Sequence, residues 1–390
     1  MPTLPEESSI PASTPLVNSE LQQALQTVVQ NLLAPALGGA TQSKQVFFAC
    51  PDPDETDKQG AKSYYAFGRI VSRQIDPFTK VDAIVNFGVL HDGKDSDSDT
   101  DDGGEQLCIR DQRLLEGWET LCRIIPSFKT SMLALSKERR LRKQACQAIQ
   151  DGVNAVRTDD RSTLKDGILD CLLLDKNTPL SPPIARKSKV KAGRGFCHPA
   201  TAALLSPIKY PVTDKNLDAL RERKLPVTAA MLPRFLYPDN HIFDADDVEN
   251  DVLRGHVLYR SAKMIFQGPS TAHDEPGAHR GQGGNAALCG LTSMTPMTIA
   301  YVAVQVRHAL SNQSSWSNTD GTFNYMEFFW NLVDLFEDEE SSKEIINFYN
   351  HHVFGTDAGA NTSDPFEKPV EDDYEILKRQ RAAKRARTNP

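Results

Sequence analysis

The segment "TPMTIAYVAVQVRHAL", residues 295–310, carries the clearest helical pattern in the sequence. Thr295 is a favoured helix cap, and Pro296 fits the first turn, where a backbone N–H is not needed. Apolar side chains then recur at the spacing of one helical face: Ile299, Val302, Ala303, Val306 and Leu310. Because Tyr301 and Val304 widen that face, we expect this helix to lie at the centre of the core.

Helical periodicity recurs upstream of this segment. One seam alternates spacings of four and three residues, with Pro126 predicting a break inside it: Leu121, Ile125, Phe128, Met132 and Leu135. A second helix should begin at Asp159 or Asp160 as its cap. Its buried stripe would hold Leu164, Ile168, Cys171 and Leu172.

Further helices are expected over 244–266, capped by acids, and around 323–337 and 341–352, where aromatic residues at helical spacing indicate core packing. About ten windows have helical periodicity, and at most one or two fit a strand. The sequence therefore predicts an all-α, multi-helix globular body.

Composition divides the chain into ordered and disordered parts. The Pro- and Ser-rich start and the polar end are too polar to fold alone. Many prolines and the basic run "ARKSKVKAGRG" at 185–195 suggest a linker between two helical lobes. The expected organisation is a disordered segment 1–17, a helical domain 18–355 (lobe 18–176, linker 177–212, lobe 213–355) and a disordered tail 356–390.

Bulk properties narrow the class of protein. The net charge of −8 argues against a wholly basic nucleic-acid coat, although it leaves room for local basic patches. The seven cysteines form no C-x-x-C pair, which favours reduced intracellular thiols over a disulfide scaffold or a cysteine-built zinc site. Neither a secretory signal nor a run long enough for a membrane span is visible, so no membrane association is expected.

The aspartate-rich stretch at 91–106 is predicted to be a solvated loop. A calcium-binding EF-hand loop needs glycine at position 6 and glutamate at position 12. Counted from Asp95, those positions hold Thr100 and Gln106, so calcium is not expected. Ser96 and Ser98 precede acids and are candidate phosphorylation sites.

The glycine-rich segment at 267–294 is the alternative place for chemistry. It lacks the Lys-Ser of a phosphate-binding loop and follows no strand, so a helix-to-helix connection is favoured. If the protein is an enzyme, this loop would cover a pocket and bring together its polar residues and glycines: His273, Asp274, Arg280, Gly283 and Gly284. Metal-ligand spacing is absent, and neither a metal nor a cofactor is expected.

The basic C-terminal segment is the strongest functional signal. It is typical of nuclear-import tags and nucleic-acid patches, and its cations are Lys378, Arg379, Arg381, Lys384, Arg385 and Arg387. The basic stretches at 185–195 and "KERRLRK" at 137–143 would either add phosphate contacts or only balance surface charge.

Several unbroken phrases resemble one known family. They include "GRGFCHPATAALLSPIKYPVT" at 193–213, "GLTSMTPMTIAYVAVQVRHALS" at 290–311 and "FYNHHVFG" at 348–355. The chain is similar over about 110–355 to the domain of unknown function 6698 family of mushroom-forming fungi. Where that family often carries paired tryptophans, this chain has Phe348 and Tyr349. The resemblance implies no activity, cofactor or catalytic residue, and it suggests a link to mobile elements.

These observations favour a non-enzymatic nuclear interaction protein. Its expected partners are an import receptor, through the basic tail, and a nucleic acid or another protein. The alternatives are a cytoplasmic location and an enzyme that uses the 267–294 loop.

Overall fold

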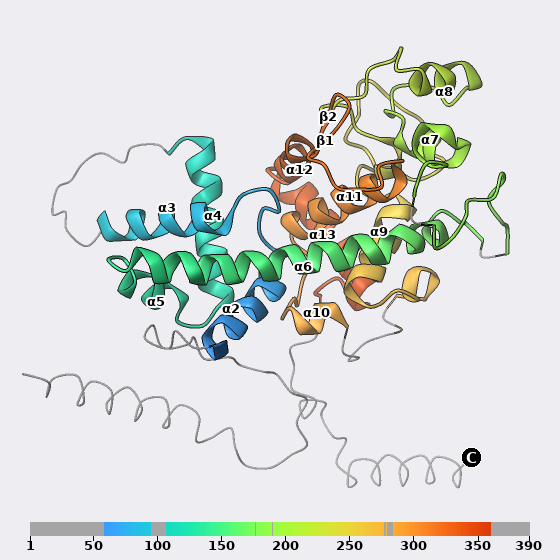
Figure 1. The fold of residues 1–390 in the computed structure, drawn as a ribbon. Helices are drawn as coiled ribbons and strands as arrows, with labels where there is room; N and C mark the ends of the chain where they lie inside the picture. Colours follow the sequence, from blue (N-terminus) through green and yellow to red (C-terminus); the bar gives the residue numbers. More distant parts are fainter. Residues whose placement is uncertain are drawn as a thin grey trace, which may run out of the picture. The chain divides into compact units, whose positions relative to one another are not determined.

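The computed structural model describes residues 58–94, 107–175, 177–188, 190–276, 278 and 284–359, all within one compact unit at 49–390 (Figure 1). These residues are mainly α-helical, as the periodicity predicted. The described strands are β1 (Thr319–Asp320) and β2 (Phe323–Asn324), which pair antiparallel with Thr319 opposite Asn324. The predicted segment 1–17, the first part of the predicted lobe at 18–57 and the residues 95–106 lie outside the described residues. Of the predicted tail at 356–390, only 356–359 is described, and it forms a turn in which the Gly359 amide donates to the Thr356 carbonyl.

The N-terminal helices surround the first half of one long helix. They are α2 (Lys58–Val71), α3 (Val81–Lys94), α4 (Ile109–Ile124), α5 (Phe128–Ala134) and the long α6 (Arg139–Cys171). Their buried side chains form one apolar cluster, which includes all five residues of the predicted seam from Leu121 to Leu135. The helix breaks between Ile124 and Phe128, as Pro126 predicted.

The C-terminal elements pack around the second half of α6. The α-helices are α7 (Pro199–Leu205), α8 (Asp214–Arg221), α9 (His256–Phe266), α10 (Asn285–Leu288), α11 (Pro296–Leu310), α12 (Tyr325–Asp334) and α13 (Glu339–Phe354). Short 3-10 helices connect them: η2 (Gly195–Cys197), η3 (Arg234–Leu236) and η4 (Thr271–His273). A second and larger apolar cluster fills this part and begins at Leu164 on α6.

Helix α11 lies at the centre of this second cluster, as its sequence predicted. Every residue from Thr298 to Leu310 is buried, and the helix packs on α6, α9 and α12. Thr295 and Thr298 form a reciprocal capping box that begins the helix at Pro296. Each fully buried Val, Ile or Leu contributes about 1.5–3 kcal/mol through removal of apolar surface from water, so this helix anchors the fold.

Helices α2 and α6 cross with their backbones in contact. A Cβ atom added to Gly68 would lie 2.0 Å from the carbonyl oxygen of Ile149, and one added to Gly152 would lie 2.1 Å from that of Tyr65. Glycine at both positions therefore allows the close approach. The crossing brings the residues that follow α2 against the middle of α6.

Three sequence predictions were wrong in detail. Helix α6 runs without interruption through Asp159 and Asp160, so neither residue is a cap. Helix α3 continues to Lys94, so the start of the stretch at 91–106 is helical rather than a loop. The helix expected over 244–266 begins only at His256, because Gly255 packs against the Phe235 carbonyl and the preceding acids form turns.

The proposed division into lobes stays a prediction. Within the described residues, the two apolar clusters meet along α6, and the segment at 177–212 contains η2 and α7.

Candidate functional site

A stripe of polar side chains runs along one face of α6. It begins at Lys143 and continues at intervals of four and three residues, which places its members on one helical face: Lys143, Gln147, Gln150, Asn154, Arg157 and Arg161. At a rise of 1.5 Å per residue, the stripe spans about 27 Å. All six residues line one cavity of about 700 Å³, which we call the α6 groove.

The opposite wall of the α6 groove comes from two other parts of the chain. The turn between α2 and α3 contributes Phe78 and Lys80, and the region from α11 to β1 contributes Gln305 and Trp316. Asp76 shapes this turn, because its carboxylate accepts hydrogen bonds from the Phe78 amide at 2.7 Å and from the Thr79 hydroxyl. The groove thus combines elements from both apolar clusters.

Arg157 lies half-buried on the floor of the groove. Its Nη1 donates to the Pro77 carbonyl, and its Nη2 donates to Asn154 Oδ1 at 2.7 Å. Burial lowers the pKa of Arg157 from its usual value. All its hydrogen-bond acceptors are neutral oxygens, and the Asp76 carboxylate acts on it only through its charge, so an anion could still pair with the guanidinium directly.

Arg161 has similar surroundings one helical turn further along. Its Nε donates to the Arg157 carbonyl at 3.0 Å, and its guanidinium carbon lies 5.2 Å from the centre of a Trp316 ring. Burial lowers the pKa of Arg161 as well. Trp316 also packs against Phe78, at 6.2 Å between ring centres, which fixes the plane on which Arg161 rests.

The charge in the groove is predominantly positive. Four cations and one carboxylate line it: Lys80, Lys143, Arg157, Arg161 and Asp82. Among the described residues, none of these cations forms an ion pair with a carboxylate. Two half-buried, like-charged guanidinium groups repel each other, so binding of an anion would be favourable.

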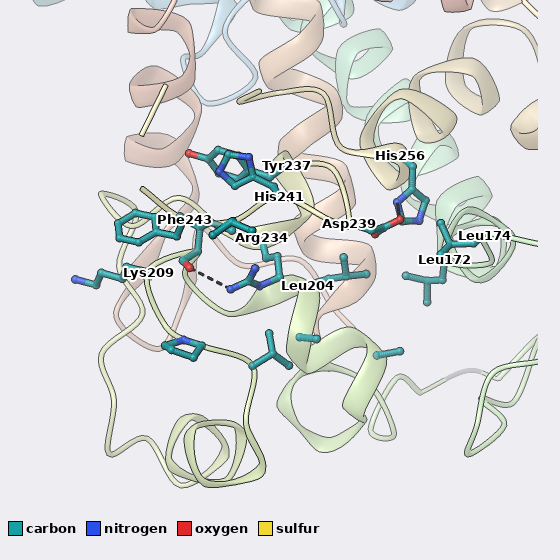
Figure 2. A pocket seen from close by; sticks show the side chains of 16 residues that line it. Leu172, Leu174, Leu204, Lys209, Arg234, Tyr237, Asp239, His241, Phe243 and His256 are labelled. Atoms are coloured by element: carbon teal, nitrogen blue, oxygen red, sulfur yellow. Dashed lines mark hydrogen bonds and ion pairs between the residues drawn. The ribbon is translucent and has the colours of Figure 1, made fainter. Parts of the chain in front are cut away.

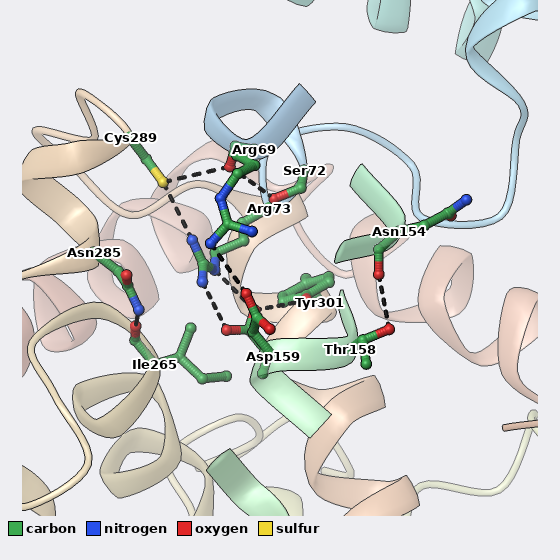
Figure 3. Close-up of polar contacts among 11 residues, drawn as sticks. Arg69, Ser72, Arg73, Asn154, Thr158, Asp159, Ile265, Asn285, Cys289 and Tyr301 are labelled. Carbon is green, nitrogen blue, oxygen red and sulfur yellow. Dashed lines mark hydrogen bonds and ion pairs between the residues drawn. The ribbon is translucent and has the colours of Figure 1, made fainter. Parts of the chain in front are cut away.

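A second arginine environment, on another face of α6, is fully paired. Arg73 donates to both carboxylate oxygens of Asp160, from Nε at 2.8 Å and from Nη2 at 2.6 Å. Tyr301 donates to the same carboxylate at 2.8 Å, and the Arg73 Nη1 lies 3.2 Å from Cys289 Sγ. Figure 3 shows Arg73 between Cys289 and Tyr301. This cluster is buried and satisfied, which makes it structural.

The pKa shifts in the paired cluster agree with that role. Burial alone would lower the pKa of Arg73, but the hydrogen bond and the charge of Asp160 raise it. Burial raises the pKa of Tyr301 well above its usual value, and the Asp160 carboxylate adds to the effect. Burial also raises the pKa of Cys289, so this thiol is protonated at neutral pH and is a poor nucleophile.

The basic segment at 185–195 has a structural role that the sequence did not predict. Lys191 Nζ donates to the His308 carbonyl at 2.5 Å, and Arg194 Nη1 donates to the Ala309 carbonyl at 3.0 Å. Both cations are buried and satisfy the last carbonyls of α11, where the helix dipole is negative. Burial and the nearby charge of Arg194 together lower the pKa of Lys191 to about 7.

The described residues of the loop at 267–294 line neither the α6 groove nor the second cavity described below. His273 Nε2 lies 2.9 Å from the Asp170 carbonyl, and the Asp274 carbonyl accepts from Lys263. Gly284 packs against the backbone at Phe266, which explains glycine at that position. Arg280 and Gly283 lie outside the described residues, as do the tail cations Lys378, Arg379, Arg381, Lys384, Arg385 and Arg387.

No group of three or more metal-ligating side chains is close enough to hold an ion in the part of the chain that the structure describes. The six described cysteines are all free. None of the described helices combines the length and the apolar character that crossing a bilayer requires.

The family model described as "Family of unknown function (DUF6698)" matches residues 151–354, which is more than half of the chain. The chain belongs to this family. No match was found among curated proteins or among solved structures. The DUF6698 span includes Arg157, Arg161 and Trp316, whereas Lys80 and Lys143 lie before it.

Sequence reasoning noticed Lys143 in the run at 137–143 but missed the groove. The available signal was the polar repeat from Lys143 to Arg161, which has the spacing of a helix face. The opposite wall could not be found this way, because Lys80 and Trp316 reach the groove only through tertiary packing.

Proposed function

We propose that this DUF6698 protein is a non-enzymatic nuclear interaction protein that binds nucleic acid through the phosphate backbone. The observation that carries the proposal is the pair of half-buried guanidinium groups, Arg157 and Arg161, which face the α6 groove without a carboxylate partner. Guanidinium groups match the geometry of phosphate oxygens, and half or more of protein–nucleic acid hydrogen bonds go to phosphate and sugar.

The shape of the groove supports an extended ligand. A stripe of about 27 Å along α6 is long enough to meet several phosphates of one strand, and its exposed Lys143 adds charge at one end. Amide side chains between the cations, such as Gln147 and Asn154, offer donors to phosphate and sugar oxygens. The basic tail at 378–387 would add non-specific attraction.

The test is fluorescence anisotropy of a labelled 20-nucleotide oligothymidylate and of a 20-base-pair duplex, titrated with the full chain. The double variant Lys143→Gln/Arg161→Gln should weaken binding at least tenfold. The slope of log affinity against log salt should become shallower by about 1.5, because two phosphate contacts are lost. Circular dichroism checks that the variant is folded.

The matched control is Lys215→Gln/Lys343→Gln, which removes the same net charge from two exposed positions outside the groove. It should retain the affinity within about twofold. Equal weakening by both double variants would show that only the overall charge matters, and the groove would lose its assignment. Absence of binding at 50 mM salt would reject the proposal.

Nuclear location is the second part of the proposal and rests on the tail cations. A fluorescent-protein fusion of the full chain should concentrate in the nucleus, and a fusion that ends at Leu377 should not. An unchanged distribution after the deletion would contradict import through this segment. It would leave the nucleic-acid measurement unaffected.

A further inference from the structure

A second cavity, of about 730 Å³, lies between α7, the segment around η3 and the start of α9 (Figure 2). We call it the α7 cavity. Its volume falls within the range of small-molecule sites, about 300–1,000 Å³. Its walls are mainly apolar and include Leu172, Leu204 and Ile208. It shares none of its lining residues with the α6 groove.

The mouth of the α7 cavity concentrates exposed apolar surface. Ile242 is 87% exposed and Leu174 is 65% exposed, and the exposed side chains of Val212 and Phe243 line the same cavity. Large apolar side chains grouped around a hollow mark a binding surface, whereas single exposed ones do not. The position of these side chains predicts that an apolar ligand covers them.

The inner polar groups indicate the charge of the ligand. Arg234 lies in the middle of the cavity, where its Nη2 donates to the Ile208 and Tyr210 carbonyls at 3.0 Å each. Its Nε is buried without a hydrogen-bond partner, and its Nη1 bonds to none of the described residues. Burial lowers the pKa of Arg234 from its usual value.

The other ionisable residues of the cavity leave this positive charge uncompensated. Asp239 is the carboxylate in the lining, and its Oδ2 lies 3.0 Å from His256 Nδ1, so the two face each other (Figure 2). Lys209 at the edge adds a second cation, whose Nζ lies 5.4 Å from the centre of the Tyr210 ring. An anion near Arg234 would supply the missing counter-charge.

We propose that the α7 cavity binds a small amphiphilic anion, with its apolar body against Leu172 and Leu204 and its carboxylate at Arg234. The α7 cavity is spatially separate from the α6 groove, since the two have no lining residue in common. The apolar body supplies most of the affinity through burial, and the arginine selects the anion over its neutral analogue.

The test uses the full chain and two probes of equal chain length, decanoate and 1-decanol. Both compete against the fluorescent apolar anion 1-anilinonaphthalene-8-sulfonate below their solubility and micelle limits. Decanoate should displace the dye at a concentration at least tenfold lower than 1-decanol. Equal potency of the two probes would overturn the proposal, because the cavity would then recognise only apolar surface.

Variants locate the binding site. Leu204→Trp fills the cavity and should weaken dye binding at least tenfold, while Leu90→Trp adds the same indole on exposed α3 and should leave it unchanged. Equal binding by both variants would place the dye elsewhere and reject the site. In Arg234→Met, the concentrations of decanoate and 1-decanol that displace the dye should differ by less than threefold.

Because Arg234 also supports two backbone carbonyls, thermal unfolding must first show that Arg234→Met folds cooperatively. If Arg234→Met does not fold, Lys209→Gln serves as the charge variant, because Lys209 is exposed. Lys209→Gln should reduce the preference for decanoate at least twofold. An unchanged preference in every folded charge variant would contradict the role of the cations.

Discussion

Arg73 and Arg161 both place a guanidinium group beside α6, but only Arg73 meets a carboxylate. Arg73 is buried and bonded twice to Asp160, whereas Arg161 lies over Trp316 and bonds to neutral oxygens along α6. The paired arginine stabilises the fold, and the unpaired one is available to a ligand. The comparison shows that the groups around a cation, rather than its presence in the sequence, decide whether its charge is neutralised within the fold.

The largest expected effect comes from breaking the paired cluster. Asp160→Ala would leave the Arg73 charge and the Tyr301 hydroxyl buried without their acceptor, so the free energy of unfolding should fall by about 3–5 kcal/mol. Urea unfolding followed by circular dichroism measures it. Asp159→Ala is the control, because its ion pair with Arg69 is exposed and should contribute less than about 1 kcal/mol.

Acid should lower the free energy of unfolding through His308, which lies near the end of α11. Burial, together with the charges of Lys191, Arg161 and Arg307, lowers the pKa of His308 to about 3. The unfolded chain binds a proton below pH 6.5, but the folded chain does not until about pH 3. The stability should therefore fall by roughly 2–4 kcal/mol as the pH falls from 6.5 to 3.

Comparison of the native chain with His308→Gln at each pH isolates this contribution from the other acids and histidines. Chemical unfolding from pH 7 to pH 4 should show a steeper loss of stability for the native chain. Parallel curves would mean that His308 titrates normally in the folded state.

A smaller loss is expected at the end of α11. Arg194→Met should lower the free energy of unfolding by about 1.5–3 kcal/mol, because a charged hydrogen bond to the Ala309 carbonyl is lost. Nucleic-acid affinity should stay within twofold, as measured by anisotropy. A tenfold loss of affinity in a folded Arg194→Met chain would move the segment at 185–195 into the binding surface.

The smallest effect on stability should come from Arg161 itself. Arg161→Gln removes a charge without a carboxylate partner, so the free energy of unfolding should change by less than about 1 kcal/mol. Thermal and urea unfolding measure the change. A loss above 2 kcal/mol would make Arg161 a structural residue like Arg73 and would remove the distinction between the two.

Caps, prolines and apolar repeats predicted those helices whose ends are set by residues within the helix or next to it. The cap at Thr295, the proline at 296 and the apolar repeat that follows them are sufficient to place α11. Asp160 shows the opposite case, because an acid before an apolar repeat has the same local pattern whether it caps a helix or pairs across the core. Only the packing of Arg73 from another segment decides between the two roles.

The candidate sites were predictable to a smaller degree. The polar repeat on α6 is present in the sequence, but the walls around it come from residues more than 50 positions away, such as Lys80 and Trp316. The basic segment at 185–195 was noticed for its charge, although two of its cations cap α11. The sequence shows which charged groups the chain contains. It does not show which hydrogen-bond acceptors surround them in the fold.

The glycine crossing of α2 and α6 has a consequence for the buried ion pair. Gly68 and Gly152 fix how closely the two helices approach, and Arg73 leaves the end of α2 only five residues after Gly68. Replacing either glycine with alanine would place a methyl group against the backbone of the other helix and push the two helices apart. The Arg73 guanidinium would then move away from Asp160. Water could then reach the buried hydroxyl of Tyr301, so the glycine crossing keeps the ion pair at the centre of the molecule dry.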